Sequence, residues 1–162
     1  MRQDGGEPRW GDEPDIVRSL WRGVVAGQME VFAPAKASSV NDPDLGPRCQ
    51  ETQRRRRGHA FHLPKAERTR IPRLGATESA PTPDKTIHAH CFVGGADWCI
   101  PEADWSTGEA FGYADLGFGD PEWGSISLPE VEEVAVGRLR QPVERDMCWA
   151  PQRFADIRRP AT

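Results

Sequence analysis

The chain of 162 residues has a formal net charge of −4, and its hydrophobic share of 37% is low for a folded protein of this length. Its 15 prolines and 16 glycines cluster unevenly, which argues against one core built from the whole sequence. No apolar run reaches the ~18 residues of a membrane span, and the N-terminus lacks a signal-peptide core, so we expect a cytoplasmic protein with reduced cysteines.

Residues 1–62 differ from the rest and predict an irregular, mostly disordered extension. Apolar residues at helical spacing between positions 16 and 25 indicate one short amphipathic helix, with Pro14 in its first turn. The segment after it has turn formers and no periodicity, which is typical of a linker. The four arginines Arg54, Arg55, Arg56 and Arg57 could contact nucleic acid or an acidic partner, although we favour a solvated charge run.

Residues 63–158 are expected to form a compact domain, with a tail at residues 159–162. The stretch TIHAHCFV alternates apolar and polar positions, and GGAD and WCI complete a hairpin. Placing Val93 opposite Trp98, and therefore Cys91 opposite Ile100, keeps the apolar face continuous, which is how register is normally fixed. This register puts three residues of metal-ligand type on the opposite face: His88, His90 and Cys99.

A second hairpin and several short helices complete the expected domain. AFGYADLGF and WGSISL surround the turn GDPE, because Asp-Pro is a strong turn former. LPKAERTRI predicts a short helix with Ala66 and Ile71 inward, and SLPEVEE predicts another in which Ser127 and Glu130 have capping-box spacing. PVERDMCW and PQRFADI predict a last strand and a last helix. The fold class is therefore α+β, a small antiparallel meander of four to five strands with short helices packed on one face.

Four separated blocks of the sequence resemble, in this order, the bacterial family called domain of unknown function 2958. The blocks are LPKAERTRIPRLGATE, IHAHCF, FGYADLGFGDPEWGSISLPEVEEV and PVERDMCW, within residues 63–157. The resemblance implies a small cytosolic protein of the kind often carried by plasmids and integrative elements. It implies no activity, no cofactor and no catalytic residue.

The charge pattern is the most informative feature for function. Between Asp84 and Glu133, eleven acidic residues accompany one strong base, Lys85, while the flanks are rich in arginine. An acidic sheet punctuated by tryptophans would engage a basic protein and repel nucleic acid, unless these acids pair with the chain's own basic helices. We therefore expect a non-enzymatic binding module, one form of which is a phosphate-mimicking decoy against restriction machinery. Its contact residues would be Glu102, Asp104, Trp105, Glu109, Asp120, Glu122 and Trp123.

The alternative hypothesis is an enzyme or metal protein centred on His88, His90 and Asp115. Together with Cys99, the two histidines could hold Zn²⁺ if a fourth ligand completed the set. No Cys-x-x-Cys pair accompanies them, and two half-exposed strand histidines are the simpler interpretation.

Asp115 is the one candidate for acid or base chemistry. If Phe118 pairs with Trp123, Asp115 falls opposite Ile126 and faces the core, where burial would raise its pKa. We prefer a structural role, either through a bulge at Gly117 or through a hydrogen bond to the loop.

Overall fold

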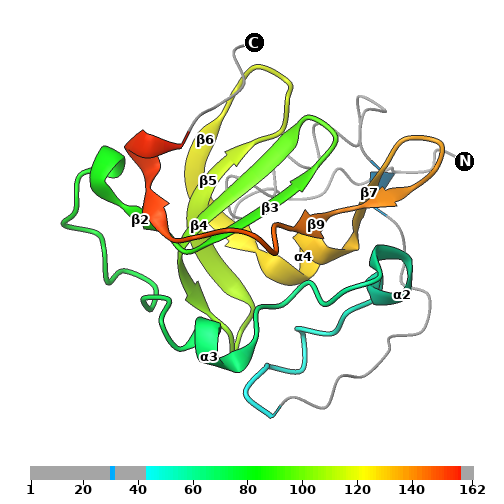
Figure 1. Cartoon of the computed structure of the whole chain (residues 1–162), viewed down its shortest axis with the longest axis horizontal. Coiled ribbons are helices and arrows are strands. Elements are labelled where there is room, and N and C mark those ends of the chain that lie inside the picture. The colour runs from blue at the N-terminus through cyan, green and yellow to red at the C-terminus, as the bar shows by residue number, and fades with distance from the viewer. Residues whose placement is uncertain (1–29, 32–42, 158–162) are drawn as a thin grey trace, which may run out of the picture.

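The computed structural model describes residues 30–31 and 43–157 of the chain. The helix predicted near residues 16–25 and the tail at residues 159–162 lie outside these ranges. A five-stranded antiparallel sheet, in the order β6-β5-β4-β3-β9, forms the centre of the molecule (Figure 1). Its strands are β3 (Ala89–Val93), β4 (Ala96–Asp104), β5 (Glu109–Asp115), β6 (Glu122–Ser127) and β9 (Glu144–Arg145).

Two smaller antiparallel sheets and several short helices surround the central sheet. One sheet contains, in this order, β1 (Glu30–Val31), β7 (Val134–Val136) and β8 (Gln141–Pro142). The other pairs β2 (Thr86–Ile87) with β10 (Gln152–Arg153). The helices are α2 (Arg54–Arg57), α3 (Lys65–Arg68) and α4 (Leu128–Glu133), with 3-10 turns η1 (Thr82–Asp84) and η2 (Phe154–Asp156). The predicted α+β class is confirmed.

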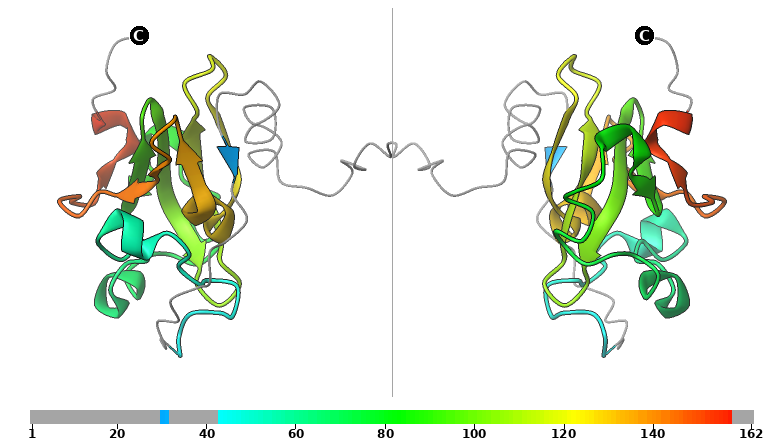
Figure 2. Two further views of the ribbon diagram at one scale, coloured as in Figure 1. Left: turned by 90° about the vertical axis from the view of Figure 1, so that its right-hand side faces the viewer. Right: turned by 90° about the vertical axis from the view of Figure 1, so that its left-hand side faces the viewer.

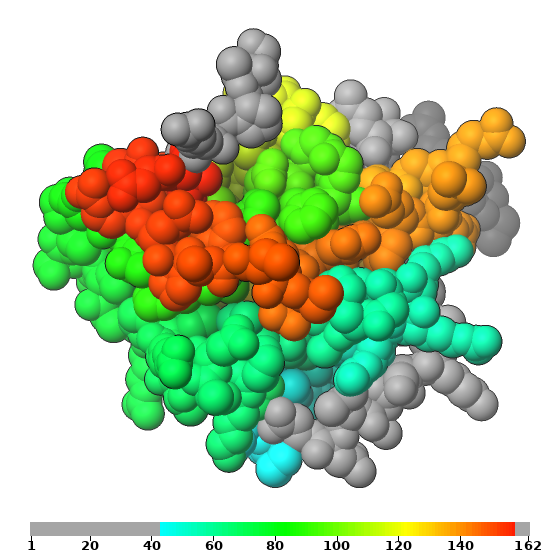
Figure 3. All heavy atoms as spheres, viewed as in Figure 1, coloured from blue at the N-terminus to red at the C-terminus, as the bar shows by residue number. Residues whose placement is uncertain are grey.

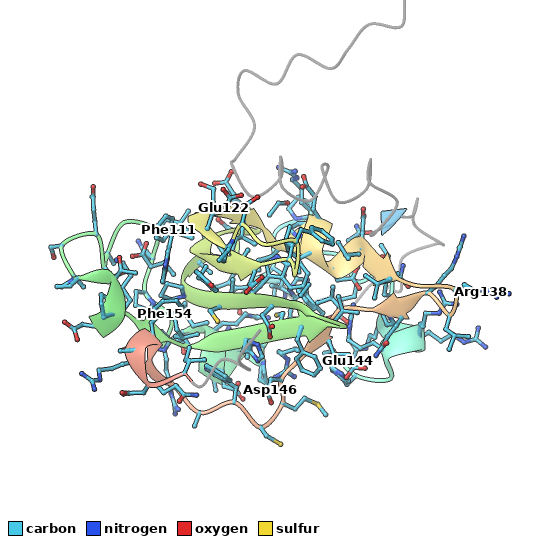
Figure 4. The ribbon with its side chains drawn as sticks, turned by 90° about the horizontal axis from the view of Figure 1, so that it is seen from above. Phe111, Glu122, Arg138, Glu144, Asp146 and Phe154 are labelled. Atoms are coloured by element: carbon cyan, nitrogen blue, oxygen red, sulfur yellow. The ribbon has the colours of Figure 1, made fainter. Side chains whose placement is uncertain are left out.

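The main apolar core lies on one face of the central sheet. It includes the almost fully buried side chains of Trp98, Ile100, Ile126, Val131 and Val134. Burying one such side chain contributes about 1.5–3 kcal/mol to folding, so this cluster is the main source of stability. Figure 4 shows that α2 and the β7–β8 hairpin, which carries the labelled Arg138, lie on this side of the sheet.

The opposite face carries a smaller cluster that is rich in aromatic rings. Ile87, Cys99 and Tyr113 are buried in it, and Trp123 and Phe154 are half-buried against them. The C-terminal segment covers this face, because β10 pairs with β2 and Trp149 Nε1 donates a hydrogen bond to the Ile87 carbonyl at 3.0 Å. Both views of Figure 2 place β1 on the β6 side of the central sheet and the C-terminal segment on the other side.

The β3–β4 hairpin is tighter than the sequence pattern suggests. The observed pairs are Val93↔Ala96, Cys91↔Trp98 and Ala89↔Ile100. The turn is therefore only Gly94–Gly95, and Gly94 has the φ of 57° that such tight hairpin turns require. The predicted pairing of Val93 with Trp98 is wrong by two residues. Because side chains alternate with a period of two, the shift leaves the residues of β3 on their predicted faces. Ile87 is an exception: it belongs to the separate strand β2 and lies in the aromatic cluster, not in the main core with Ala89, Cys91 and Val93.

The β5–β6 hairpin has a longer loop than predicted. The last pair of its ladder is Ala114↔Glu122, and residues 116–121 connect the two strands. Phe118 therefore does not pair with Trp123, which faces Tyr113. Gly117 and Gly119 adopt left-handed φ values of 74° and 97° that permit this wider path.

Residues 43–62 pack onto the domain, where the sequence pattern suggested a linker. Cys49, Glu51 and Phe61 are buried, and Gly46 N donates a hydrogen bond to the Trp105 carbonyl at 3.0 Å. Among the described residues, the packed unit therefore includes residues 43–62 as well as the predicted domain. Within the described ranges, none of the helices has the length and apolar character needed to cross a bilayer.

Two short helices differ in detail from their predictions. In α3, Ala66 is exposed while Arg68 is buried, although Ile71 is buried as expected. At α4, Ser127 occupies the N-cap position but its side chain makes no capping hydrogen bond, so the predicted capping box does not form. The last predicted helix is reduced to β10 and the single turn η2.

Candidate functional site

The seven residues predicted to contact a basic partner do not form one surface. Asp104 and Glu109 lie where β4 ends and β5 begins, whereas Asp120 and Glu122 lie at the other end of β5. A seven-residue strand separates these two groups by roughly 20 Å. The acidic hairpins therefore present two small groups of carboxylates at opposite ends.

Glu102 is part of the fold and is unavailable to a partner. It is 2% exposed and accepts hydrogen bonds from the backbone N–H groups of Gly75 and Thr77, at 2.5 Å and 2.8 Å. The Thr77 hydroxyl also donates to this carboxylate, and Lys85 Nζ donates to the Thr77 carbonyl. Glu102 thus holds the loop of residues 73–85 against the sheet.

Other predicted acids accept hydrogen bonds within turns. Asp104 accepts the backbone N–H and the hydroxyl of Ser106 at 2.9 Å and 2.5 Å, and these bonds lower the pKa of the Asp104 carboxyl. Asp115 accepts the N–H of Gly117 at 2.9 Å and faces Asp97 across the β4–β5 ladder. The core-facing position predicted for Asp115 is therefore wrong, and the preferred hydrogen bond to the loop is confirmed.

The two predicted contact tryptophans pack against the domain. Trp105 is half-buried against the main core, with the guanidinium of Arg68 at 5.9 Å from its ring centroid. Trp123 is half-buried in the aromatic cluster, with the ring of Phe154 at 4.8 Å. Both side chains are therefore largely used in packing.

Members of the predicted histidine-cysteine set contact other groups in the structure. His90 Nε2 lies 2.8 Å from Asp97 Oδ1, and Nδ1 lies 3.6 Å from Asp146 Oδ2. Cys99 is buried in the aromatic cluster, and burial lowers the pKa of His88. Among the residues that the structure describes, no group of three or more His, Cys, Asp or Glu side chains could hold a metal ion. The structure therefore gives no support to the metal alternative.

The arginine run divides into one internal and three surface residues. Arg57 and Glu132 form an ion pair at 3.0 Å in which both side chains are 0% exposed. Glu132 also accepts the backbone N–H groups of Thr52 and Gln53, each at 2.9 Å, and Arg57 Nε donates to the Val143 carbonyl at 2.5 Å. This buried pair locks α2 against α4 and against the end of β8. Arg57, which was predicted with its neighbours as a ligand contact, is unavailable for that role.

The other three arginines lie beside a second basic segment. Arg55 and Arg56 are exposed, and the Arg54 side chain is 39% exposed and lies 4.0 Å from Glu51. α2 packs against β8, and Figure 3 shows α2 and the β7–β8 hairpin protruding at the same edge of the molecule. We call this surface the basic ridge; its residues are Arg54, Arg55, Arg56, Arg138 and Arg140.

The hairpin tip of the basic ridge has an unusual composition. It consists of Gly137, Arg138, Leu139 and Arg140, and Leu139 is 90% exposed. Arg140 N donates to the Gly137 carbonyl at 3.0 Å, and left-handed φ values of 70° at Gly137 and 51° at Arg140 close the turn. The sequence signal GRLR between two short strands was present, but nothing local connected it to Arg54–Arg56.

The comparisons with known proteins identify the family. The model of a family described as "Protein of unknown function (DUF2958)" matches residues 63–156, more than half of the 162 residues. The chain belongs to this family. The resemblance of the four sequence blocks is thereby confirmed, while no curated protein and no solved structure matches the chain.

Only part of the basic ridge lies within the residues that match the DUF2958 family. The matched residues include the β7–β8 hairpin with Arg138 and Arg140, whereas Arg54–Arg56 precede the match. The ridge therefore joins the DUF2958 domain to a flanking segment that the Arg57–Glu132 pair holds in place.

Proposed function

We propose that the chain is a non-enzymatic binding module that contacts the phosphate backbone of nucleic acid through the basic ridge. The observation that carries this proposal is the buried Arg57–Glu132 pair, which fixes α2 beside the β7–β8 hairpin and so places exposed arginines from two segments on one edge. Guanidinium groups suit such a ligand because each presents several donors in a planar fork that matches two phosphate oxygens.

The net charge of −4 does not oppose this proposal. Exposed charges are screened over about 8 Å at physiological ionic strength, so a phosphate responds to the nearest groups and hardly to the whole chain. Figure 4 shows Arg138 at one extremity of the molecule and Glu122 well away from it. In α2, the buried Arg57 is paired with Glu132, and the surface residue Arg54 lies 4.0 Å from Glu51.

Contacts of this kind position a protein on nucleic acid without reading its sequence. Arginine–phosphate contacts release condensed counterions, so affinity falls steeply as salt rises. We therefore expect binding that depends strongly on ionic strength and weakly on base sequence.

The test is the fluorescence anisotropy of a labelled duplex of about 20 base pairs, titrated between ~50 and ~200 mM salt. Each lost phosphate contact reduces the slope of log K against log salt by about 0.9, so the R55A/R56A variant should reduce it by about 1.8. The R70A/R73A variant removes the same charge from two other exposed arginines and should change the slope little.

Absence of duplex binding at low salt, or equal losses in the two variants, would contradict the proposal. In that event the alternative is binding of a basic protein by the loop of residues 116–121, where Phe118 is 39% exposed near Asp120. It would be favoured if the wild-type chain captured a basic protein in low salt and a D120N/E122Q variant did not.

A further inference from the structure

We propose that the tip of the β7–β8 hairpin inserts Leu139 between base pairs of double-stranded DNA, while Arg138 and Arg140 contact the adjoining phosphates. This inference rests on the proposed function and names its ligand more narrowly, as a duplex that is locally unstacked and bent at the point of contact.

Leu139 is the most exposed of the large apolar side chains in the described ranges. It is 90% exposed, whereas Met147 is 63% exposed and Leu74 is 39% exposed. A leucine that is this exposed at the apex of a turn contributes little to the packing of the described part of the chain. Its flanking residues are both arginines, so a polyanion that approaches the arginines also meets the leucine.

Buried side chains and backbone hydrogen bonds anchor the base of the hairpin in the domain. Val134 and Val143 are 0% exposed, and Val143 N donates to the Val134 carbonyl at 3.1 Å. β7 pairs with β8 on one side and with β1 on the other. Arg57 Nε donates to the Val143 carbonyl at 2.5 Å, which couples the hairpin directly to α2. The base of the hairpin and α2 are therefore held to each other through Arg57.

This arrangement matches the way in which apolar wedges deform DNA. A two-stranded β-ribbon fits into a groove of the duplex, and arginines beside an inserted apolar side chain hold the backbone while the base step opens. Such wedges bend DNA by about 20–90°. The bend would also turn the neighbouring backbone toward Arg55 and Arg56, which lie beside the hairpin.

A lipid surface is a less suitable ligand for the same tip. Stable attachment to a bilayer needs a broad apolar face or two independent anchors, and Leu139 is a single apolar side chain between two charged ones. One inserted side chain is enough to unstack a base step. The observations therefore favour the duplex.

The experiment uses the full chain and a duplex with 2-aminopurine at a central A·T-rich step and a donor–acceptor dye pair at its ends. The wild-type chain should raise the 2-aminopurine emission and shorten the distance between the dyes. L139A should keep its affinity within about threefold, because phosphate contacts dominate affinity, but it should lose both signals. L139F should retain them, and L74A, which removes another exposed leucine, should behave as the wild type.

The outcomes separate this inference from the function on which it rests. Salt-sensitive binding of the wild type without unstacking, or unstacking that persists in L139A, overturns the wedge and leaves the basic ridge intact. Absence of duplex binding overturns both. Binding to anionic vesicles that depends on Leu139, with no unstacking of the duplex, overturns the wedge in favour of a lipid surface. Thermal melting of each variant checks that the fold is retained.

Discussion

The acidic hairpins and the basic ridge carry opposite charges, and the fold uses them differently. Within the acidic segment Glu102 and Glu132 are buried, and Asp104 and Asp115 accept hydrogen bonds in turns. In the four-arginine run only Arg57 is buried, and the other three side chains reach solvent. The acidic segment has more charged residues than the arginine run, but several of them are buried or bonded within turns and do not form one continuous surface.

The chemistry of hydrogen bonding explains this difference. Loops contain backbone N–H donors that no strand or helix pairs, and a buried donor without an acceptor costs about 1–3 kcal/mol. Carboxylates accept such donors, as Glu102 does for Gly75 and Thr77 and as Glu132 does for Thr52. Arginines have no acceptor atom and cannot serve these donors. A count of acids in a sequence consequently overstates the negative surface that a partner can meet.

The largest effect that follows from this contrast should come from the buried ion pair. Replacing Glu132 by Gln removes the charge opposite Arg57 and leaves a buried, uncompensated guanidinium. We expect a loss of about 3–5 kcal/mol in the free energy of unfolding, measured by urea titration.

A double variant provides the control for this pair. R57M/E132L replaces both charged side chains by apolar ones and should recover most of the loss, because a buried pair is often replaceable by well-packed apolar groups. A cost below about 1 kcal/mol for Glu132→Gln alone, which is the range of surface pairs, would show that the pair is not the clamp described above.

A smaller effect is expected at the second buried carboxylate. Glu102→Gln weakens the charge-assisted hydrogen bonds from Gly75 and Thr77 and should cost about 1–3 kcal/mol. The exposed Glu109→Gln removes the same charge from the same hairpin and should stay within about 0.5 kcal/mol of the wild type. Faster amide hydrogen exchange at Thr77 in the first variant alone would locate the effect. Equal costs in the two variants would contradict the assignment.

The buried thiol of Cys91 differs from the buried carboxylates because burial keeps it neutral. Burial raises the pKa of Cys91 from its ordinary 9.0 to about 12. The unfolded chain therefore releases this proton first, so the contribution of Cys91 is complete below pH 9 and is lost as the pH rises toward 12. Between these limits the free energy of unfolding should fall by about 1.4 kcal/mol per pH unit more in the wild type than in Cys91→Ala. Parallel pH profiles would show that the thiol is not buried as described.

The strands of the central sheet could be predicted from sequence, but β1, β7, β8 and β10 and the lengths of the connections could not. The alternation in residues 89–93 predicts which side chains face the main core, and this assignment is correct despite a register error of two residues, whereas Ile87 lies in the other cluster. Glycine permits both a two-residue turn at Gly94–Gly95 and a wide loop at Gly117 and Gly119, so local composition does not distinguish them.

The candidate site could be predicted only in part, because it depends on contacts between residues that are far apart in the sequence. The arginine run is visible in sequence, whereas its position beside Arg138 and Arg140 depends on a pair between Arg57 and Glu132 that are 75 residues apart. No periodicity marks such a pair. Glu102 was misassigned to the surface because its partners, Gly75 and Thr77, are backbone donors in a loop that had no predicted structure.

The most direct test of the central claim compares the two halves of the basic ridge. Duplex affinity is measured against salt for the wild type, for R55A/R56A and for R138A/R140A. If both segments bind one phosphate backbone, each double variant reduces the slope by about 1.8 while R70A/R73A leaves it nearly unchanged. A slope that responds to only one of the two segments, or equally to the control, would contradict the account.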